Sequence, residues 1–291
     1  NGNYDYLMYA DLDFKHPDVI KNLYDWAKWF IETTGIRGFR LDAVKHIDSF
    51  FMANFIRDIL QEYGDDFYVF GEFWNNDEVA NNDYLENIDY RFDLVDVKLH
   101  TNLFEASQKG EEYDLRTIFD HTLVKNHPES AVTFVENHDT QRGQALESTV
   151  EEWFKPAAYA LILLRESGLP CIFYGDYYGI SGEFAQQDFQ EEIDKLLDLR
   201  LNLAYGEETD YFDDPNCIGW TRAGQDGGQP IAVLISNATA TSKRMYFGQD
   251  WSGHECSDYL GNCQTIVTID EEGWGEFPVE EQSVSVWSIK N

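Results

Sequence analysis

The sequence predicts an α/β protein over residues 1–205, followed by an antiparallel β domain over residues 206–291. Two observations support this division. Segments with the apolar stripe of a helix alternate with short buried strands in the first part, while the second part consists of short strands separated by turns. Strands and helices that alternate in this way form parallel sheets through right-handed crossovers. Periodicity alone leaves two architectures open, a (β/α)8 barrel and an open doubly wound sheet.

Helix predictions depend on apolar stripes and on residues that start or stop a helix. Residues 17–34 carry one continuous stripe and Gly35 follows it, so we expect a helix that ends there. A second helix is expected at residues 48–63 for the same reasons. The stretch 149–167 also has a helical pattern, but Pro156 predicts a kink or a late start because proline lacks an N–H group.

Five short strands are expected in the first part, because each run is rich in aromatic and β-branched residues and is bounded by turn signals. They are IRGFRLD at 36–42, FYVFGEF at 67–73, IDYRFDLV at 88–95, AVTFVENHD at 131–139 and LPCIFYG at 169–175. Beyond residue 205, the runs IGWTRAG, PIAVLISN, RMYFGQ, TIVTID and SVSVWSI predict the antiparallel β domain.

The charge of the chain excludes some partners. Its 54 acidic and 21 basic residues give a formal net charge of −33, which would repel nucleic acid, so calcium or a neutral ligand fits better. No apolar run approaches the ~20 residues of a membrane span, and the first residues carry neither a basic start nor an apolar signal core. The sequon Asn237-Ala238-Thr239 favours an extracellular protein, with an intracellular location as the alternative.

Four cysteines occur, and none has the CxxC spacing of a zinc or redox site. Cys256 and Cys263 flank a short polar turn, so we expect them to form a disulfide, with free buried thiols as the alternative. Cys171 lies in the apolar run PCIFYGD and is expected in the core of a strand.

Acidic residues stand at the carboxyl ends of three predicted strands. Asp42 ends one strand, Glu72 ends the next one 30 residues later, and Asp139 ends a later strand. The carboxyl ends of barrel strands meet at one face, which is where barrel enzymes place their chemistry. Each residue alone could instead be a helix N-cap. Neighbouring strands lie ~4.8 Å apart, so Asp42 and Glu72 could come within roughly 5–6 Å, a separation typical of double displacement through a covalent glycosyl-enzyme.

The neighbours of the first two carboxylates predict opposite environments for them. Strand side chains alternate, so Arg40 and Asp42 lie on one face, where the guanidinium would keep the carboxylate ionised as a nucleophile requires. Glu72 is followed by Phe73 and Trp74, which can form an apolar wall. Such a wall would raise the pKa of Glu72 by desolvation and keep on it a proton to donate, although Trp74 could also serve ordinary packing.

Three motifs resemble conserved segments of a known family. GFRLDAVKH at 38–46, GEFW at 71–74 and FVENHDT at 134–140 resemble, in order and spacing, segments of the α-amylase family of glycoside hydrolases (family 13). The stretches 3–19 and 147–176 are similar to the bacterial liquefying α-amylases and their fungal relatives. The resemblance implies the C-terminal part of a (β/α)8 TIM barrel followed by an antiparallel β-sandwich domain.

The resemblance implies a retaining α-amylase that hydrolyses internal α-1,4 bonds of starch. Carried over residue by residue, Asp42 is the nucleophile, Glu72 is the general acid/base, and Asp139 fixes sugar hydroxyls and stabilises the transition state. The residues that would contact the substrate are Arg40, Lys45, His46, Trp74 and His138. Two alternatives stay open: a glucanotransferase or another enzyme of the same superfamily, and a non-catalytic carbohydrate-binding homologue, which the three retained carboxylates disfavour.

The resemblance also implies a calcium site, with sodium as an optional member of the same cluster. Asp5, Asp11 and Asp13 match the family's metal ligands, and the backbone carbonyl of His46 is a further ligand. Carboxylate and carbonyl oxygens are the hard ligands that calcium prefers. Without the resemblance, the segment YDYLMYADLD would be interpreted as a solvated acidic loop.

A further calcium site of these relatives, between the barrel and the C-terminal domain, is not expected. Gly110 and Tyr113 match that site. Pro215, Asn216 and Asn237 stand where the resemblance implies better ligands.

The family's first strands and its inserted metal-rich domain have no counterpart from Asn1 onward. Five strands cannot close an eight-stranded barrel, and they would leave an exposed strand edge. We therefore expect two partners: an α-glucan substrate, and the N-terminal part of the same enzyme as a separate chain. Neither nucleic acid nor a membrane is expected as a partner.

Overall fold

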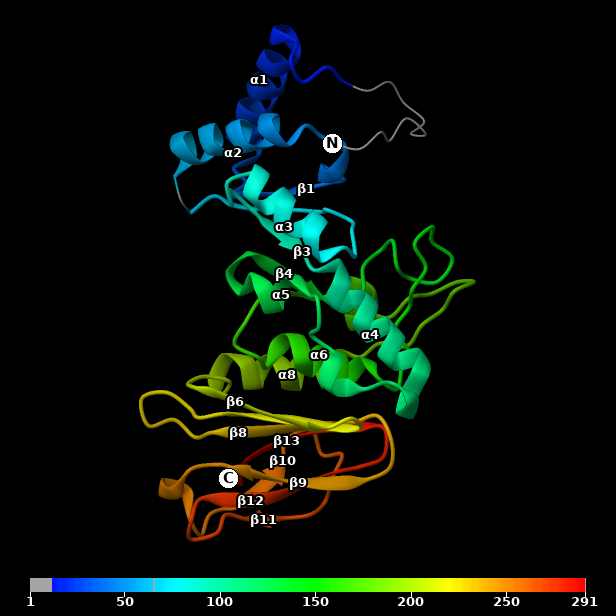
Figure 1. Cartoon of the computed structure of the whole chain (residues 1–291), viewed down its shortest axis with the longest axis vertical. Helices are drawn as coiled ribbons and strands as arrows, with labels where there is room; N and C mark the ends of the chain where they lie inside the picture. Colours follow the sequence, from blue (N-terminus) through cyan, green and yellow to red (C-terminus); the bar gives the residue numbers. More distant parts are fainter. Residues whose placement is uncertain (1–11, 65, 291) are drawn as a thin grey trace. The chain divides into compact units, whose positions relative to one another are not determined.

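The computed structural model describes residues 12–64 and 66–290, and Figure 1 shows how its elements follow one another. The chain forms two compact units, and each is described by itself. The first unit comprises residues 1–98 and 121–132, and the second comprises residues 99–120 and 133–291.

The first unit is built on parallel strands that pair in chain order. They are β1 (Gly38–Leu41), β2 (Tyr68–Gly71), β3 (Asp93–Val95) and the first residues of β4 (Ala131–Phe134). Leu41 pairs with Gly71, and Leu94 pairs with both Gly71 and Ala131. Parallel pairing brings the carboxyl ends of these strands to the same edge of the sheet, as the alternation of strands and helices predicts.

The helices of the first unit include the two that the sequence predicts at 17–34 and 48–63. The helices are α1 (Pro17–Thr34), η1 (Val44–His46), α2 (Ser49–Tyr63), α3 (Glu78–Asn87), α5 (Leu123–Asn126) and η4 (Pro128–Ser130). Gly35 ends α1 in the left-handed conformation with φ of 69°. The Asp48 carboxylate accepts a hydrogen bond from the Phe51 N–H group at 2.8 Å and so begins α2. Both helix predictions are confirmed.

The second unit begins within α4 (Val97–Lys109) and continues with short elements. They are η2 (Gly110–Glu112), η3 (Leu115–Thr117), α6 (Lys155–Leu163), β5 (Leu169–Cys171), α7 (Tyr174–Tyr178) and α8 (Gln190–Asn202). Pro156 lies in the first turn of α6, so the late start that it predicted is confirmed. The strand expected at 169–175 is shorter than expected, because the chain turns into α7 at Tyr174.

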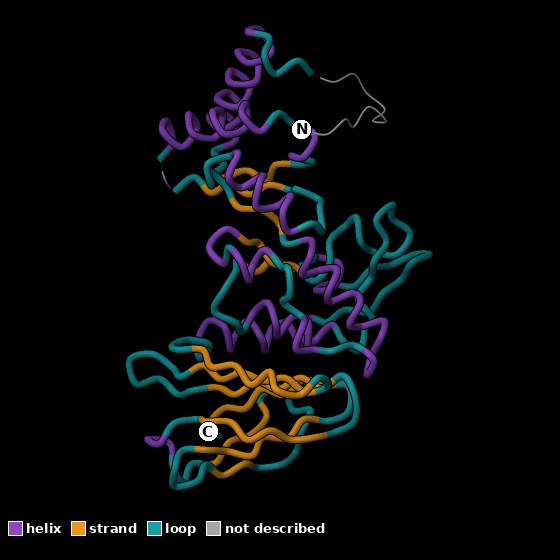
Figure 2. The backbone as a smooth tube through the Cα atoms, in the orientation of Figure 1, coloured by secondary structure: helices purple, strands orange, loops and turns teal. Residues whose placement is uncertain are grey.

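The rest of the second unit is antiparallel, as predicted. Its strands are β6 (Glu208–Asp214), β7 (Cys217–Arg222), β8 (Ile231–Ser236), β9 (Thr241–Tyr246), β10 (Glu255–Asp258), β11 (Val267–Thr268), β12 (Trp274–Val279) and β13 (Ser283–Ile289), with the short helix η5 (Gln249–Trp251). One sheet has the order β11-β10-β13-β8-β7-β6, and β12 pairs with β9 in a second. Figure 2 shows the two sheets in orange. Leu234, Phe277 and Trp287 belong to the shared apolar core that joins them into a sandwich.

The cysteine predictions are wrong. Cys256 and Cys263 are buried in the apolar core of the sandwich and do not form a disulfide. Burial raises the pKa of the Cys256 thiol to about 12, so this side chain packs as a small apolar group. Cys171 lies on β5 but is exposed, because this strand ends there and does not continue into a buried run.

Candidate active site

The ends of β1 and β2 bring three of the predicted site residues together. Arg40 donates from Nη2 to Glu72 Oε2 at 3.0 Å, and its Nη1 contacts Asp42 Oδ1. The register explains this arrangement, since Leu41 pairs with Gly71 and the next residue of each strand carries a carboxylate. One guanidinium therefore binds both Asp42 and Glu72, which places the two carboxyl groups close together.

The two carboxyl groups differ in exposure. The Asp42 side chain is 72% exposed, whereas Glu72 is 7% exposed. Burial raises the pKa of Glu72, the N–H group of Ala43 at 3.3 Å and Arg40 oppose this rise, and Asp42 adds to it. Phe73 is buried as predicted and stacks on Tyr84 with ring centroids 4.4 Å apart. Glu72 thus has an environment that favours the protonated acid more than water does.

The chain folds back over the end of β2 directly after β1. Ala43 adopts a left-handed conformation with φ of 49°, and the Val44 N–H group donates to the Glu72 carbonyl at 3.0 Å. This turn starts η1, which contains Lys45 and His46. Lys45 Nζ donates to the Trp74 carbonyl at 3.1 Å, so the residues after the two carboxylates contact each other.

His138 and Asp139 lie in the second unit, in the loop after β4. His138 Nε2 is 3.3 Å from Asp139 Oδ2, and both side chains reach solvent. Asn137 shapes this loop, because its Oδ1 accepts hydrogen bonds from the N–H groups of Asp139 at 2.9 Å and Thr140 at 3.1 Å. The sequence analysis missed Asn137, although an asparagine directly after a strand is a signal for such a turn.

The predicted calcium ligands are only partly described. Asp5 and Asp11 lie outside the described residues. Asp13 is exposed and its Oδ1 accepts a hydrogen bond from the Lys15 N–H group at 3.0 Å, and His46 belongs to η1. Within residues 12–64 and 66–290, no group of three His, Cys, Asp or Glu side chains could hold a metal ion. Asp13 offers an accessible oxygen of the type that calcium prefers.

At the further calcium site of the relatives, the residues present do not fit a metal ion. Asn237 is 0% exposed, and its amide Nδ2 donates to the carbonyls of Gly110 and Tyr113, each at 2.8 Å. Asn216 Nδ2 donates to the Glu111 carbonyl at 2.8 Å and to Asn237 Oδ1 at 2.9 Å. Amide N–H groups thus face the carbonyl oxygens that a cation would need. The burial of Asn237 also removes the sequon as support for secretion, because a glycan needs an accessible amide.

Comparisons with known proteins identify the family. The sequence profile of the family described as "Alpha amylase, catalytic domain" matches residues 3–227, and that of "Alpha-amylase C-terminal" matches residues 231–288. The two matches together cover most of the chain. This chain belongs to the α-amylase family.

Curated relatives match the chain over its whole length. It is 47% identical to a glucan 1,4-alpha-maltohexaosidase of Bacillus sp. (strain 707), over 100% of this chain and 56% of that protein. It is 47% identical to an α-amylase of Geobacillus stearothermophilus (99% and 52%) and 44% identical to one of Bacillus licheniformis (99% and 57%). The chain therefore spans about half the length of the curated relatives it matches.

Solved structures support the fold. A crystal structure of an Anoxybacillus α-amylase matches with a TM-score of 0.72 at 23% identity, over 96% of this chain and 64% of that chain. The Geobacillus thermoleovorans α-amylase complexed with acarbose matches with a TM-score of 0.69 at 24% identity, over 96% and 66%. With the family match, these likenesses confirm the predicted fold class, the C-terminal part of a TIM barrel followed by an antiparallel sandwich. No helix among the described residues is long and apolar enough to cross a membrane.

Proposed function

We propose that this chain carries the catalytic carboxylates of a retaining α-amylase, a glycoside hydrolase that cleaves internal α-1,4-glucosidic bonds of starch and related glucans. The observation that carries the proposal is the Arg40 guanidinium bound to both an exposed and a buried carboxyl group, Asp42 and Glu72. The names of the relatives at 44–47% identity support the substrate class.

In the first step, Asp42 attacks the anomeric carbon of the glucosyl unit while Glu72 donates its proton to the departing glycosidic oxygen. The carbon–oxygen bond to the leaving sugar breaks, and an ester bond to Asp42 forms. Two carboxyl groups bound by one guanidinium support the short separation of a double displacement over the wider one that holds a water molecule. The exposure of Asp42 leaves its carboxylate open to the sugar.

In the second step, Glu72 accepts a proton from a water molecule, which attacks the anomeric carbon and releases Asp42. The same residue can serve as acid and base because burial raises its pKa while Arg40 and the Ala43 N–H group stabilise the anion. Glu72 starts protonated, loses its proton in the first step and regains it in the second.

The remaining site residues receive roles that follow the family resemblance. We propose that Asp139 and His138 bind sugar hydroxyls on the glucosyl side of the scissile bond. Lys45 and His46 would contact the sugar on the leaving side, and Trp74 would stack on a sugar face. The contact between Lys45 and the Trp74 carbonyl supports a common location for these residues.

We also propose the calcium site at Asp5, Asp11, Asp13 and the His46 carbonyl, and a boundary between the catalytic part and the sandwich domain near residue 205. A calcium ion bound there would hold the segment before α1 against η1. The expectation of an extracellular location stays a prediction, since a curated relative at 40% identity is a cytoplasmic α-amylase of Escherichia coli. The N-terminal part of the enzyme as a separate chain stays a prediction as well.

The function is tested by introducing Glu72→Gln into the active enzyme. We expect starch hydrolysis to fall by about 10³-fold, because the variant can neither protonate the leaving group nor activate water. Glu62→Gln is the matched control, since Glu62 lies on α2 and pairs with Lys28 at the surface, and it should keep full activity. Activity of Glu72→Gln within a few-fold of wild type would contradict the proposal, and longer or cyclic glucan products would indicate transfer.

A further inference from the structure

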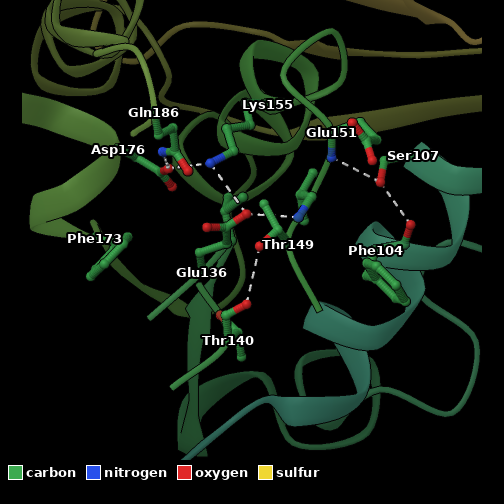
Figure 3. A network of polar contacts seen from close by, with 12 residues as sticks. Phe104, Ser107, Glu136, Thr140, Thr149, Glu151, Lys155, Phe173, Asp176 and Gln186 are labelled. Atoms are coloured by element: carbon green, nitrogen blue, oxygen red, sulfur yellow. Dashed lines mark hydrogen bonds and ion pairs between the residues drawn. The ribbon is translucent and has the colours of Figure 1, made fainter. Parts of the chain in front are cut away.

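A buried network of ionisable groups lies directly after β4, among residues that have no role above. Glu136, Lys155 and Asp176 are 1%, 0% and 0% exposed. Lys155 Nζ contacts Asp176 Oδ1 and lies 3.2 Å from Glu136 Oε1 (Figure 3). The three residues come from the end of β4, the start of α6 and α7, so the network ties three segments of the second unit together.

The two carboxyl groups of this network are not equivalent. Asp176 accepts hydrogen bonds from Tyr159 OH at 2.6 Å and Gln186 Nε2 at 2.7 Å, in addition to the lysine contact. Oε2 of Glu136 has no partner in the described part of the chain. A buried carboxylate oxygen without a partner is costly when it is charged. Asp176 is therefore the better stabilised carboxylate of the two, and Glu136 is the one that binds a proton more readily.

The charged groups around Glu136 agree with this assignment. Burial and the negative charge of Asp176 raise the pKa of Glu136 to about 7, while Lys155 opposes the rise. The titratable groups that face it are Asp176, Lys155 and Tyr159, and burial raises the pKa of Tyr159 well above its ordinary value, so this phenol stays neutral.

Glu136 also closes the loop that carries His138 and Asp139. Its Oε1 accepts a hydrogen bond from the Val150 N–H group at 2.7 Å, across the whole loop of residues 137–149. Inside the loop, the hydroxyl of Thr149 donates to the Thr140 carbonyl at 3.2 Å, a contact that Figure 3 also shows. The side chain directly before the loop thus binds the first residue after it, and Lys155 holds that side chain in place.

We propose that Glu136 and Lys155 are positioning residues that hold residues 137–149 in the shape that Asp139 needs to bind the sugar. The inference rests on the proposed function, because it takes Asp139 as a group that touches the substrate. Neither Glu136 nor Lys155 can touch a glucan itself, since both are buried. A displacement of a reacting group by about 1 Å can lower a rate by ~10²-fold, so a loosened loop should lower kcat strongly.

The test compares Glu136→Gln with Glu136→Ala in the active enzyme. Glutamine keeps the length of the side chain and one oxygen that can accept from Val150 and Lys155, and it is neutral like the protonated acid. We expect its kcat to stay within about threefold of wild type. Alanine removes both hydrogen bonds, and we expect kcat to fall ~10²-fold with a smaller change in KM.

Hydrogen exchange provides a readout that does not depend on activity. The N–H groups of Asp139 and Thr140, which Asn137 binds, should exchange faster in Glu136→Ala and at the wild-type rate in Glu136→Gln. Asp258→Ala is the matched control, because Asp258 is also a buried carboxyl that accepts backbone N–H groups, those of Cys263 and Val286 at 2.9 Å each. It should lower the unfolding temperature and leave both the loop exchange and kcat unchanged.

Two results would overturn the inference. Folded Glu136→Ala with wild-type kcat and wild-type exchange in the loop would show that the network does not position Asp139. Glu136→Gln as impaired as the alanine variant would show that the carboxylate acts as a charge. If the alanine variant does not fold, Glu136→Asp replaces it in the test. Its side chain is one methylene too short to reach both Val150 and Lys155, so we expect kcat to fall about tenfold. An unchanged kcat of this variant would overturn the inference. Full activity of Glu72→Gln would refute the proposed function instead, whatever the exchange data show.

Discussion

We expect His100 to make the stability of the protein depend on pH. Replacing this one residue should isolate its effect. Its ring is 1% exposed and stacks on Phe134, with ring centroids 5.1 Å apart. Nδ1 is 2.7 Å from the Val135 carbonyl, which can only accept, so Nδ1 carries the proton. Nε2 is 2.8 Å from the Ser148 hydroxyl oxygen. His100 on α4 therefore joins both ends of the loop that contains Asp139.

Burial lowers the pKa of His100 from 6.5 to about 4, and the hydrogen bond to Val135 only partly opposes this. Because the pKa in the folded state is depressed, the contribution to stability is fully present above pH 6.5 and is lost as the pH falls through about 4. One pKa unit corresponds to about 1.4 kcal/mol, so the difference between the ordinary pKa of 6.5 and the pKa of about 4 in the folded state corresponds to about 3 kcal/mol of unfolding free energy. Wild type should lose this amount between pH 7 and pH 3, in addition to what other groups contribute.

The measurement is urea unfolding of wild type and His100→Gln at several values between pH 7 and pH 3. At pH 7 the variant should be less stable, because glutamine does not replace the ring stacked on Phe134. As the pH falls, the variant should lose about 3 kcal/mol less than wild type, because it has no proton to take up at this position. Stability curves that run parallel over the whole range would refute the reasoning.

Two further predictions concern bound calcium and an aromatic cage. A chelator should lower the unfolding temperature and added calcium should restore it, because an ion bound to the folded state stabilises that state; an unchanged temperature would speak against the calcium site. Arg165 lies over Phe119 at 4.9 Å and Trp220 at 5.4 Å and pairs with Glu208 at 2.7 Å. Arg165→Lys should lower the free energy of unfolding by about 2 kcal/mol, because an ammonium group is not planar and cannot stack on the rings or donate two parallel hydrogen bonds to a carboxylate. A loss below about 0.5 kcal/mol in thermal unfolding would contradict this.

Features that depend on residues close together in the sequence were predictable, for example the helices α1 and α2. The adjacency of Asp42 and Glu72 was also predictable, because it follows from strand alternation and parallel register. The strand expected at 88–95 shows the limit of such patterns. Asp89 and Tyr90 adopt left-handed conformations with φ of 54° and 51°, so the chain turns there and β3 begins only at Asp93. The apolar and aromatic residues before Asp93 resembled a strand although their backbone does not form one.

The buried network could not be predicted from local patterns, because its members are far apart in the sequence. Glu136 meets Lys155 and Asp176 only through the packing of α6 and α7 against the end of β4. The disulfide prediction failed for a related reason. Two cysteines at a suitable spacing can equally serve as small apolar core residues, and only the packing of the sandwich decides between these roles.

A raised pKa alone would have identified the wrong catalytic acid. Burial raises the pKa of both Glu72 and Glu136, and the rise is large enough at Glu136 to bring its pKa to about 7. Glu136 is nevertheless enclosed by a lysine, a second carboxylate and backbone, and no substrate can reach it. Glu72 is beside an exposed carboxylate that can attack a sugar, and one arginine binds both. The combination of a buried acid with an accessible carboxylate therefore distinguishes the proposed catalytic glutamate, Glu72, from the proposed positioning one, Glu136.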